Sequence, residues 1–272
     1  MNPTEIKALL ARLGGAPNKR LGQHFLIDGA TLETIVEAGE IQGGETVLEI
    51  GPGLGVLTNE LLDRGANVIA IEKDRRYAAY HEERKLKNLK IVQGDAIQID
   101  WMKLVGKKPW KLIANLPYAI TSYALRLGLW AKHPPECIVV LVQKEVAERA
   151  IARDGKQSLL SLMVALVSSE ARILRKVPPG CFYPPPRVDS AVLYFKPLDP
   201  KARKAQWGID PERVMELAKK GFSKPRKLLR SNLGISEADS QAWEALQINP
   251  KARAEDLSPS QWASLAKGIK TA

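Results

Sequence analysis

The feature that most limits the fold of this chain is a regular alternation of short apolar segments with amphipathic ones. The short apolar segments, which suit buried strands, lie at residues 46–50, 67–71, 89–92, 112–114 and 138–142. Residues 30–39, 57–64 and 75–86, between them, have helical spacing. Strands that are separated by helices form a mostly parallel sheet with both faces covered. The sequence therefore predicts an α/β fold.

The two ends of the chain differ from this alternating region. Residues 1–28 form an arm with a short helix. Residues 29–197 contain the alternating region and two further strands, expected at 173–177 and 190–195, on either side of a proline-rich loop. After a short linker, residues 201–272 have helical patterns, and Trp207, Trp243 and Trp262 could form a small core there. We therefore expect an N-terminal arm, an α/β domain and a small helical domain, with these bounds.

Composition narrows the class of protein. The net charge of +11 favours an anionic partner, of which nucleic acid is the commonest, although a generic basic protein fits equally well. The two cysteines, Cys137 and Cys181, are far apart, and the three histidines are scattered, so neither a disulfide framework nor a metal site is expected. No apolar run is long enough to span a membrane, and the N-terminus lacks a signal-peptide core. A cytoplasmic location is the default expectation.

A glycine-rich turn follows the first predicted strand. Its pattern is Glu49-x-Gly51-x-Gly53-x-Gly55. Glycines let a backbone adopt positive φ and approach a ligand closely, and ligands of open α/β sheets bind at the carboxyl ends of the strands. A dinucleotide fingerprint would have the spacing G-x-G-x-x-G, but here the third glycine comes one residue early. This spacing disfavours NAD and suits a turn that binds a methyl donor, with Gly51 and Gly53 as contacts.

Two acidic residues follow the next two predicted strands. Glu72 ends the second strand, where a carboxylate can accept both hydroxyls of a ribose; an acid at a helix N-terminus is the alternative. Asp95 follows the third strand, where it can accept from the amino group of a cofactor adenine; a turn aspartate after Gly94 is the alternative. The glycine turn and the two acids lie where one nucleoside would cross adjacent strand ends.

The segment Asn115-Leu-Pro-Tyr118 follows the fourth predicted strand and suits a flat ring with an amino group. The Asn115 side-chain oxygen and the carbonyl of Leu116 can both accept from an exocyclic amine, and proline fixes the backbone so that the two acceptors converge. The Tyr118 ring can stack on a base. Two acceptors would expose the amine lone pair for attack on an activated methyl group, so neither a strong base nor a metal is needed. A structural strand-end turn is the alternative.

Further candidates lie in the second half of the chain. Phe182, in the proline-rich loop, is a second candidate platform for the target base, and core packing is its alternative. Four basic residues between 222 and 230 are candidates for phosphate contacts, with a solvated helix face as the alternative: Lys224, Arg226, Lys227 and Arg230. Lys19, Arg20, Lys144 and Arg149 are weaker candidates for contacts with RNA.

Taken together, these motifs resemble the ribosomal RNA small subunit adenine N6,N6-dimethyltransferase family, the KsgA-type enzymes. The resemblance runs from about Lys19 to Leu233. The segments that carry it are Leu21-Gly-Gln-His-Phe-Leu26, Leu48-Glu-Ile-Gly-Pro-Gly-Leu-Gly55, Ile71-Glu72, Gly94-Asp95, Asn115-Leu-Pro-Tyr-Ala-Ile-Thr-Ser122, Gln143-Lys-Glu-Val-Ala-Glu-Arg149 and Phe182-Tyr-Pro-Pro-Pro-Arg-Val-Asp-Ser190.

The resemblance implies a Rossmann-like class I methyltransferase sheet with a small C-terminal all-α domain. It implies that the arm closes over S-adenosylmethionine, which is held by residues matching His24, Leu26, Gly51, Glu72, Asp95 and Asn115. It implies a monomer that dimethylates two adjacent adenines in a hairpin near the 3′ end of small-subunit rRNA, within a ribosomal assembly particle. Many members have Asn at the position of His24, so the contact there is expected through the backbone or the imidazole.

Two alternative functions remain open at the level of the sequence. One is a related enzyme that modifies large-subunit rRNA, with the same chemistry on a different target. The other is a non-catalytic RNA-binding assembly factor with the same fold. The intact Asn115-Leu-Pro-Tyr118 segment and the acidic cofactor residues argue against the second of these.

Overall fold

The computed structural model describes residues 1–18, 21–152, 157–235, 243 and 246–268. These residues form two compact units. The first contains residues 1–147 and 172–197, and the second contains residues 148–171 and 198–272. The expected helical domain comprised 201–272 alone, whereas the second unit also includes the segment 148–171. The chain contributes to this unit twice, since it enters the unit near residue 148, leaves it near 171 and enters it again at 198.

A seven-stranded sheet forms the centre of the first unit as far as the chain is described, with the order β4-β3-β2-β5-β6-β9-β7. The neighbouring pairs from β4 to β6 are parallel, and β9 runs antiparallel to β6. This arrangement confirms the Rossmann-like sheet. The strands are β2 (Thr46–Ile50), β3 (Asn67–Glu72), β4 (Leu89–Gln93), β5 (Trp110–Asn115), β6 (Ile138–Gln143), β7 (Ser168–Val177) and β9 (Ser190–Pro197).

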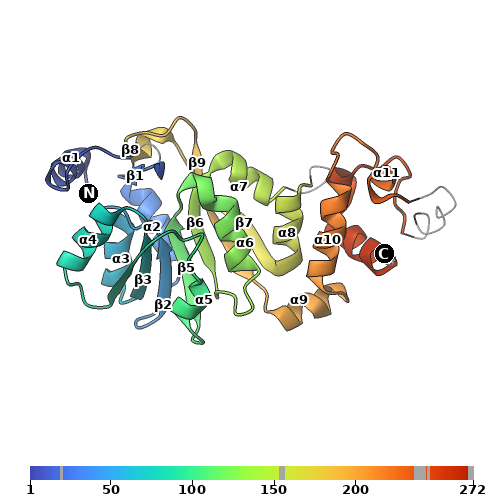
Figure 1. Cartoon of the computed structure of the whole chain (residues 1–272), viewed down its shortest axis with the longest axis horizontal. Helices are drawn as coiled ribbons and strands as arrows, with labels where there is room; N and C mark the ends of the chain where they lie inside the picture. Colours follow the sequence, from blue (N-terminus) through green and yellow to red (C-terminus); the bar gives the residue numbers. More distant parts are fainter. Residues whose placement is uncertain (19–20, 153–156, 236–242, 244–245, 269–272) are drawn as a thin grey trace. The chain divides into compact units, whose positions relative to one another are not determined.

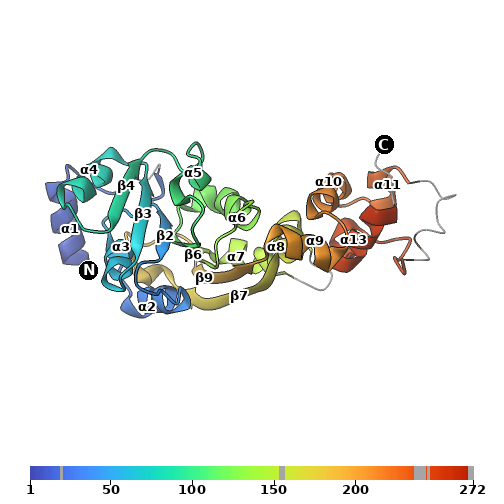
Figure 2. The ribbon, with the colours of Figure 1, turned by 90° about the horizontal axis from the view of Figure 1, so that it is seen from below.

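Helices cover both faces of this sheet, with α2 and α3 on one side and α5 and α6 on the other (Figure 2). Alternation along β5 explains how one strand serves both layers. Ile113 belongs to the core that contains residues of α2 and α3, whereas Leu112 lies close to Gly128 of α6. The helices of this unit are α1 (Pro3–Arg12), α2 (Gly29–Ala38), α3 (Val56–Asp63), α4 (Arg75–Glu83), α5 (Trp101–Val105), α6 (Thr121–Leu129) and α7 (Lys144–Ala150), of which α7 extends into the second unit.

The N-terminal arm is anchored by its own small core. Ile6 and Leu10 of α1 are buried with Phe25, Leu54 and Tyr77. The short strand β1 (Phe25–Leu26) pairs antiparallel with β8 (Phe182–Tyr183) of the proline-rich loop, and the two lie side by side in Figure 1. The arm is therefore connected to the glycine turn through Leu54, to α4 through Tyr77 and to the loop through β8.

In its described residues, the second unit contains helices, turns and loops and, as its strand, the first residues of β7. Its helices are α8 (Leu159–Val167), α9 (Pro200–Trp207), α10 (Pro211–Gly221), α11 (Leu229–Leu233) and α13 (Pro259–Gly268). Trp262 is fully buried, and Gly221 lets it pack closely, because a Cβ at Gly221 would lie 2.5 Å from the tryptophan ring. Trp243 is also buried, and Trp207 donates from Nε1 to the carbonyl of Leu166 at 2.9 Å.

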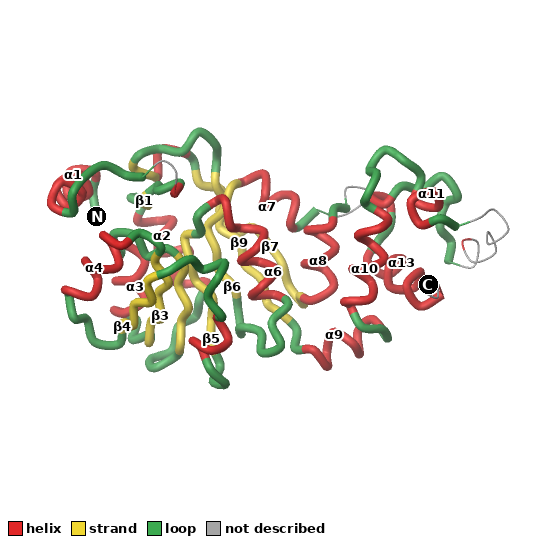
Figure 3. Tube along the Cα trace, viewed as in Figure 1, coloured by secondary structure: helices red, strands yellow, loops and turns green. Residues whose placement is uncertain are grey.

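Most of the expected elements are present, with three differences. The strand expected at 173–177 begins five residues earlier, at Ser168, and the helix expected at 75–86 ends at Glu83. The segment 222–228, for which a solvated helix face was the alternative, forms turns between α10 and α11 (Figure 3). In the described residues, no helix is long and apolar enough to cross a membrane.

Candidate active site

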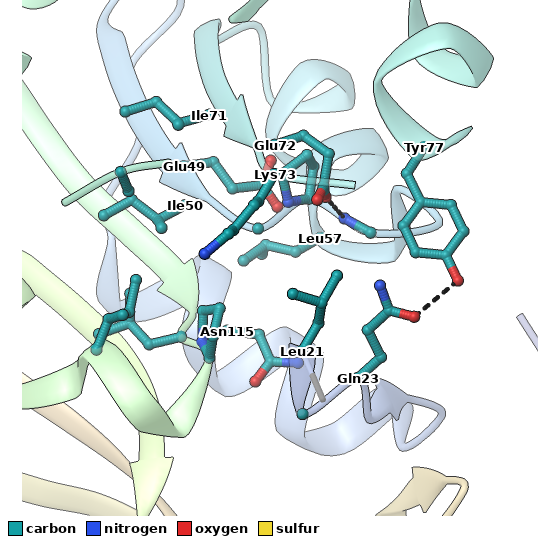
Figure 4. A pocket seen from close by; sticks show the side chains of 18 of the residues that line it. Leu21, Gln23, Glu49, Ile50, Leu57, Ile71, Glu72, Lys73, Tyr77 and Asn115 are labelled. Atoms are coloured by element: carbon teal, nitrogen blue, oxygen red, sulfur yellow. Dashed lines mark hydrogen bonds between the residues drawn. The ribbon is translucent and has the colours of Figure 1, made fainter. Parts of the chain in front are cut away.

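A cavity of about 190 Å³ lies where the carboxyl ends of β2, β3, β4 and β5 meet the arm. Figure 4 looks into it, with Glu49 and Glu72 across the cavity from Leu21 and Gln23. Nine of the predicted site residues line it: His24, Leu26, Gly51, Gly53, Glu72, Asp95, Asn115, Leu116 and Tyr118. The strands β2 to β5 run parallel, so their carboxyl ends share one edge of the sheet. This explains why the residues at the ends of these strands converge.

The glycine turn forms one wall of the cavity. Gly51, Gly53 and Gly55 have φ values of 72°, 55° and 87°, which residues with side chains rarely adopt. A Cβ at Gly53 would lie 3.2 Å from the ring of Phe25, and one at Gly51 would lie 3.4 Å from Pro117. The turn therefore needs glycine for its conformation and for the close approach of the arm.

Glu72 is almost fully buried and connects this turn to β3. Its Oε2 accepts from the Gly53 N–H at 3.0 Å, and its Oε1 accepts from the Asp74 N–H at 2.7 Å. Burial raises the pKa of Glu72, and the backbone donors oppose that shift. Each carboxylate oxygen has a further lone pair, so Glu72 can still accept from a ligand hydroxyl.

Asp95 has two local partners. Its Oδ2 accepts from Lys73 Nζ at 2.7 Å, and its Oδ1 accepts from the Ile97 N–H at 3.0 Å. The contact with Lys73 is the main reason why the pKa of Asp95 is lowered. The bond to Ile97 is that of a turn aspartate, so Asp95 shapes its turn and also presents a carboxylate to the cavity.

Asn115 is oriented by the arm. Its Nδ2 donates to the carbonyl of His24 at 3.3 Å, and because a carbonyl only accepts, the Asn115 oxygen remains an acceptor. The Leu116 N–H donates to the Leu141 carbonyl at 3.1 Å, which fixes the adjoining peptide. The backbone of His24 thus orients Asn115, while the expected contact of His24 with the cofactor stays a prediction.

Tyr118 is held from two sides. Its hydroxyl bonds to Ser190 Oγ at 2.7 Å, and its ring stacks on the His24 imidazole at 6.0 Å between centroids. The imidazole is itself fixed, because His24 Nδ1 bonds to the carbonyl of Pro184 at 2.7 Å. His24 therefore joins the arm, Tyr118 and the proline-rich loop.

The structure does not bring Phe182 to the cavity. Its side chain is 2% exposed and packs in the sheet core with Leu26 and Val177. This placement agrees with the alternative of core packing, because a platform for an incoming base needs an accessible ring.

The candidate RNA contacts are on the surface of their units where they are described. Lys224, Arg226 and Lys227 are exposed, and Arg230 is half-buried. Asn232 Nδ2 donates to the carbonyls of Gly221 and Lys224, so the turn itself is held in place. Lys144 pairs with Asp189, Arg149 is exposed, and Lys19 and Arg20 lie outside the described residues.

Several residues of the cavity were not predicted as contacts. Glu49 lines it with a side chain that is 1% exposed, and Thr58 Oγ1 donates to its Oε2 at 2.8 Å. Burial raises the pKa of Glu49 to about 8. Gln23 also lines it, and it bonds to Asp74 and to the Tyr77 hydroxyl. The position of Glu49, two residues before Gly51, could have indicated that Glu49 lines the cavity. The contacts of Gln23 depend on the fold of the arm.

The fold and the site together define a Rossmann-like, S-adenosylmethionine-dependent methyltransferase. The site fits this cofactor, because two carboxylates and a turn of positive-φ glycines can receive a nucleoside with free hydroxyl and amino groups. The described residues contain no group of three or more side chains suited to hold a metal.

Comparison with known proteins gives the family. The model of the ribosomal RNA adenine dimethylase family matches residues 15–271. A ribosomal RNA small subunit methyltransferase A from Dehalococcoides mccartyi is 40% identical, over 91% of this chain and 86% of the relative. Another with that description, from a Nostoc species, is 39% identical, over 92% of this chain and 97% of the relative. The chain therefore belongs to the ribosomal RNA adenine dimethylase family, and it is an rRNA adenine methyltransferase.

Two solved structures support the same fold. A dimethyladenosine transferase from Plasmodium falciparum has a TM-score of 0.75 and 26% identity, and the match covers 89% of this chain and 96% of that one. The 23S rRNA methyltransferase ErmE has a TM-score of 0.69 and 27% identity, over 89% of this chain and 98% of that one.

Proposed function

We propose that this enzyme transfers methyl groups to the N6 amines of two adjacent adenines in a hairpin near the 3′ end of small-subunit rRNA, during ribosome biogenesis. The observation that carries the proposal is the orientation of Asn115, whose amide nitrogen is engaged by His24 so that its oxygen is available to an amine. The small-subunit target follows the relatives at about 40% identity. We further propose that the protein acts in the cytoplasm as a monomer, on an assembly particle.

Glu72 and Asp95 would hold the nucleoside of S-adenosylmethionine, with the glycine turn against it. When bound, this cofactor supplies a methyl group that is already activated for transfer. The arm would close the site, because His24 and Leu26 line the same cavity and are fixed there by hydrogen bonds and by strand pairing. A closed site excludes water from the reacting atoms.

The residues that follow β5 would orient the target amine. Asn115 Oδ1 and the Leu116 carbonyl would each accept one of its hydrogens, which leaves the nitrogen lone pair free for attack. The His24 imidazole would move away from one face of the Tyr118 ring, and Tyr118 would then stack on the adenine. Rate enhancement would come mainly from this positioning. The role of Phe182 as a second platform for the target base stays a prediction. It requires that the buried Phe182 side chain first leave the core.

The exposed turn with Lys224, Arg226 and Lys227, together with Arg230 in the first turn of α11, would contact rRNA phosphates. Three of these side chains are exposed on a turn that Asn232 holds in place, which suits contacts that position a nucleic acid. Such contacts carry no sequence information of their own. The choice of adenine would therefore depend on the shape of the rRNA and on the cavity.

The test is a transfer assay with labelled S-adenosylmethionine and, in parallel, immature small and large ribosomal subunits. We expect label in small-subunit rRNA at two neighbouring adenines near the 3′ end. The likeness to ErmE makes a large-subunit target the second candidate. Label in large-subunit rRNA alone would select that candidate and overturn the first.

A further inference from the structure

His81 is a buried imidazole directly behind the glycine turn. It lies on α4 with Tyr77 and Ala78 on the inward face of the helix, and it is 1% exposed. It does not line the cavity, and none of the roles assigned above involves it. A Cβ at Gly55 would lie 2.7 Å from His81 Cε1, so the ring is in direct contact with the turn.

The hydrogen bond of His81 fixes its tautomer. Nε2 lies 3.0 Å from the carbonyl oxygen of Gly53, and because that oxygen can only accept, Nε2 carries the proton. Nδ1 is buried and has no hydrogen-bond partner among the described residues. Burial, the larger cause, and the neighbouring Arg84 lower the pKa of His81 to about 4, so the ring is neutral at physiological pH. The ring therefore has one N–H donor, and this Nε2–H bonds to the Gly53 carbonyl.

The Gly53 residue is thus held at both of its polar groups. Its N–H donates to Glu72 Oε2 from one side, and its carbonyl accepts from His81 on the other. Glu72 ends β3 and His81 lies on α4, so two separate elements hold one residue of the turn. Gly53 has a φ of 55°, and both it and its partner Glu72 line the cavity.

We propose that His81 is a positioning residue for the cofactor: its Nε2–H holds the Gly53 carbonyl and thereby keeps the glycine turn and Glu72 in the arrangement that binds S-adenosylmethionine. This inference rests on the proposed cofactor site. It adds a residue that touches neither cofactor nor substrate and that lies nine positions beyond the end of β3.

Two variants separate the hydrogen bond from the packing of the ring. His81→Leu fills much of the same volume without a donor, whereas His81→Gln retains an N–H at a similar reach. Binding of S-adenosylmethionine is measured by calorimetry without RNA, and folding is checked by thermal unfolding without cofactor. We expect His81→Leu to lower affinity by about 5- to 30-fold, as for one lost hydrogen bond, and His81→Gln to retain most of it.

In transfer assays, the leucine variant should raise KM for the cofactor and leave kcat at saturating cofactor close to that of the wild type. Unchanged affinity in a folded leucine variant would overturn the proposal, and so would an equal loss in both folded variants. The ring ¹⁵N chemical shifts of the wild type give an independent check. The Nε2–H tautomer is expected, and the Nδ1–H tautomer would contradict the proposal.

A parallel measurement on Asp95→Ala keeps this proposal separate from the site on which it rests. If Asp95→Ala weakens cofactor binding and His81→Leu does not, the site stands and the role of His81 is wrong. If Asp95→Ala has no effect, the cofactor site itself is wrongly assigned.

Discussion

Single carboxylates in the cavity should determine cofactor affinity. Asp95→Ala removes the acceptor proposed for the adenine amine and should weaken S-adenosylmethionine binding by about 1–3 kcal/mol, because a buried ligand group would lose its partner. Calorimetry without RNA measures the effect. Asp100→Ala is the matched control, since Asp100 is an exposed aspartate that caps α5. Equal affinities for the two variants would refute the role of Asp95.

Glu49 should make stability depend on pH. Its pKa is raised to about 8 in the folded protein, so an unfolded chain releases this proton at a lower pH than the native one does. The stabilisation is therefore fully present below about pH 4.5 and is lost as pH rises towards 8. Relative to Glu49→Gln, the wild type should lose up to about 5 kcal/mol of unfolding free energy across this window.

Chemical denaturation of the cofactor-free protein at several pH values measures this difference. Glu37→Gln, on the exposed side of α2, controls for the loss of a carboxylate. A constant difference between wild type and Glu49→Gln from pH 5 to 8 would show that Glu49 is ionised throughout.

Asn115 should matter for turnover more than for binding of RNA. Asn115→Ala removes the acceptor proposed for the target amine, whereas RNA affinity should come from dispersed phosphate contacts. We expect at least a hundredfold loss of kcat with RNA affinity almost unchanged, measured by single-turnover transfer and by filter binding. Turnover within tenfold of the wild type would exclude the catalytic role.

At the scale of elements, the basic turn between α10 and α11, with Arg230 at the start of α11, should carry RNA contacts. Replacing Lys224, Arg226, Lys227 and Arg230 by Gln should weaken RNA binding and flatten its salt dependence, by up to roughly 0.9 in slope for each lost phosphate contact. A salt series of RNA affinities tests this.

A control with the same change in charge replaces Lys201, Lys204, Lys219 and Lys220, which are exposed on α9 and α10. If both quadruple variants reduce the salt slope equally, net charge rather than the turn is responsible. Affinity for S-adenosylmethionine should remain unchanged in both variants, because these residues lie in the second unit.

The predictable elements are those in which the hydrophobic pattern of the sequence matches the burial of the residues in the structure. The run 138–142 is apolar throughout, the run 46–50 has three apolar residues, and each forms a strand with at most one partly exposed residue. The pairing of β1 with β8 was not predictable, because each strand has two residues and the partners are separated by more than 150 positions. Phe182 illustrates the same limit, since it is paired with Leu26 of β1 and lies in the same core.

At the scale of the whole molecule, the cavity was largely predictable because parallel strands bring their carboxyl ends to one edge. Glu72 ends β3 and Asp95 follows the adjacent β4, and they lie at one edge because the two strands are neighbours and run parallel. The contacts of His81 and Ser190 were not predictable, since they depend on the packing of α4 on the turn and of β9 beside β6. Residues 148–171 likewise join the second unit through tertiary packing.

The most direct test of the central claim is the identity of the modified nucleoside. Small-subunit rRNA from immature particles, after incubation with enzyme and S-adenosylmethionine, is digested to nucleosides and analysed by mass spectrometry. The account predicts N6,N6-dimethyladenosine with the wild type and little methylated adenosine with Asn115→Ala. Methylation at another atom, or undiminished N6,N6-dimethyladenosine with Asn115→Ala, would contradict it.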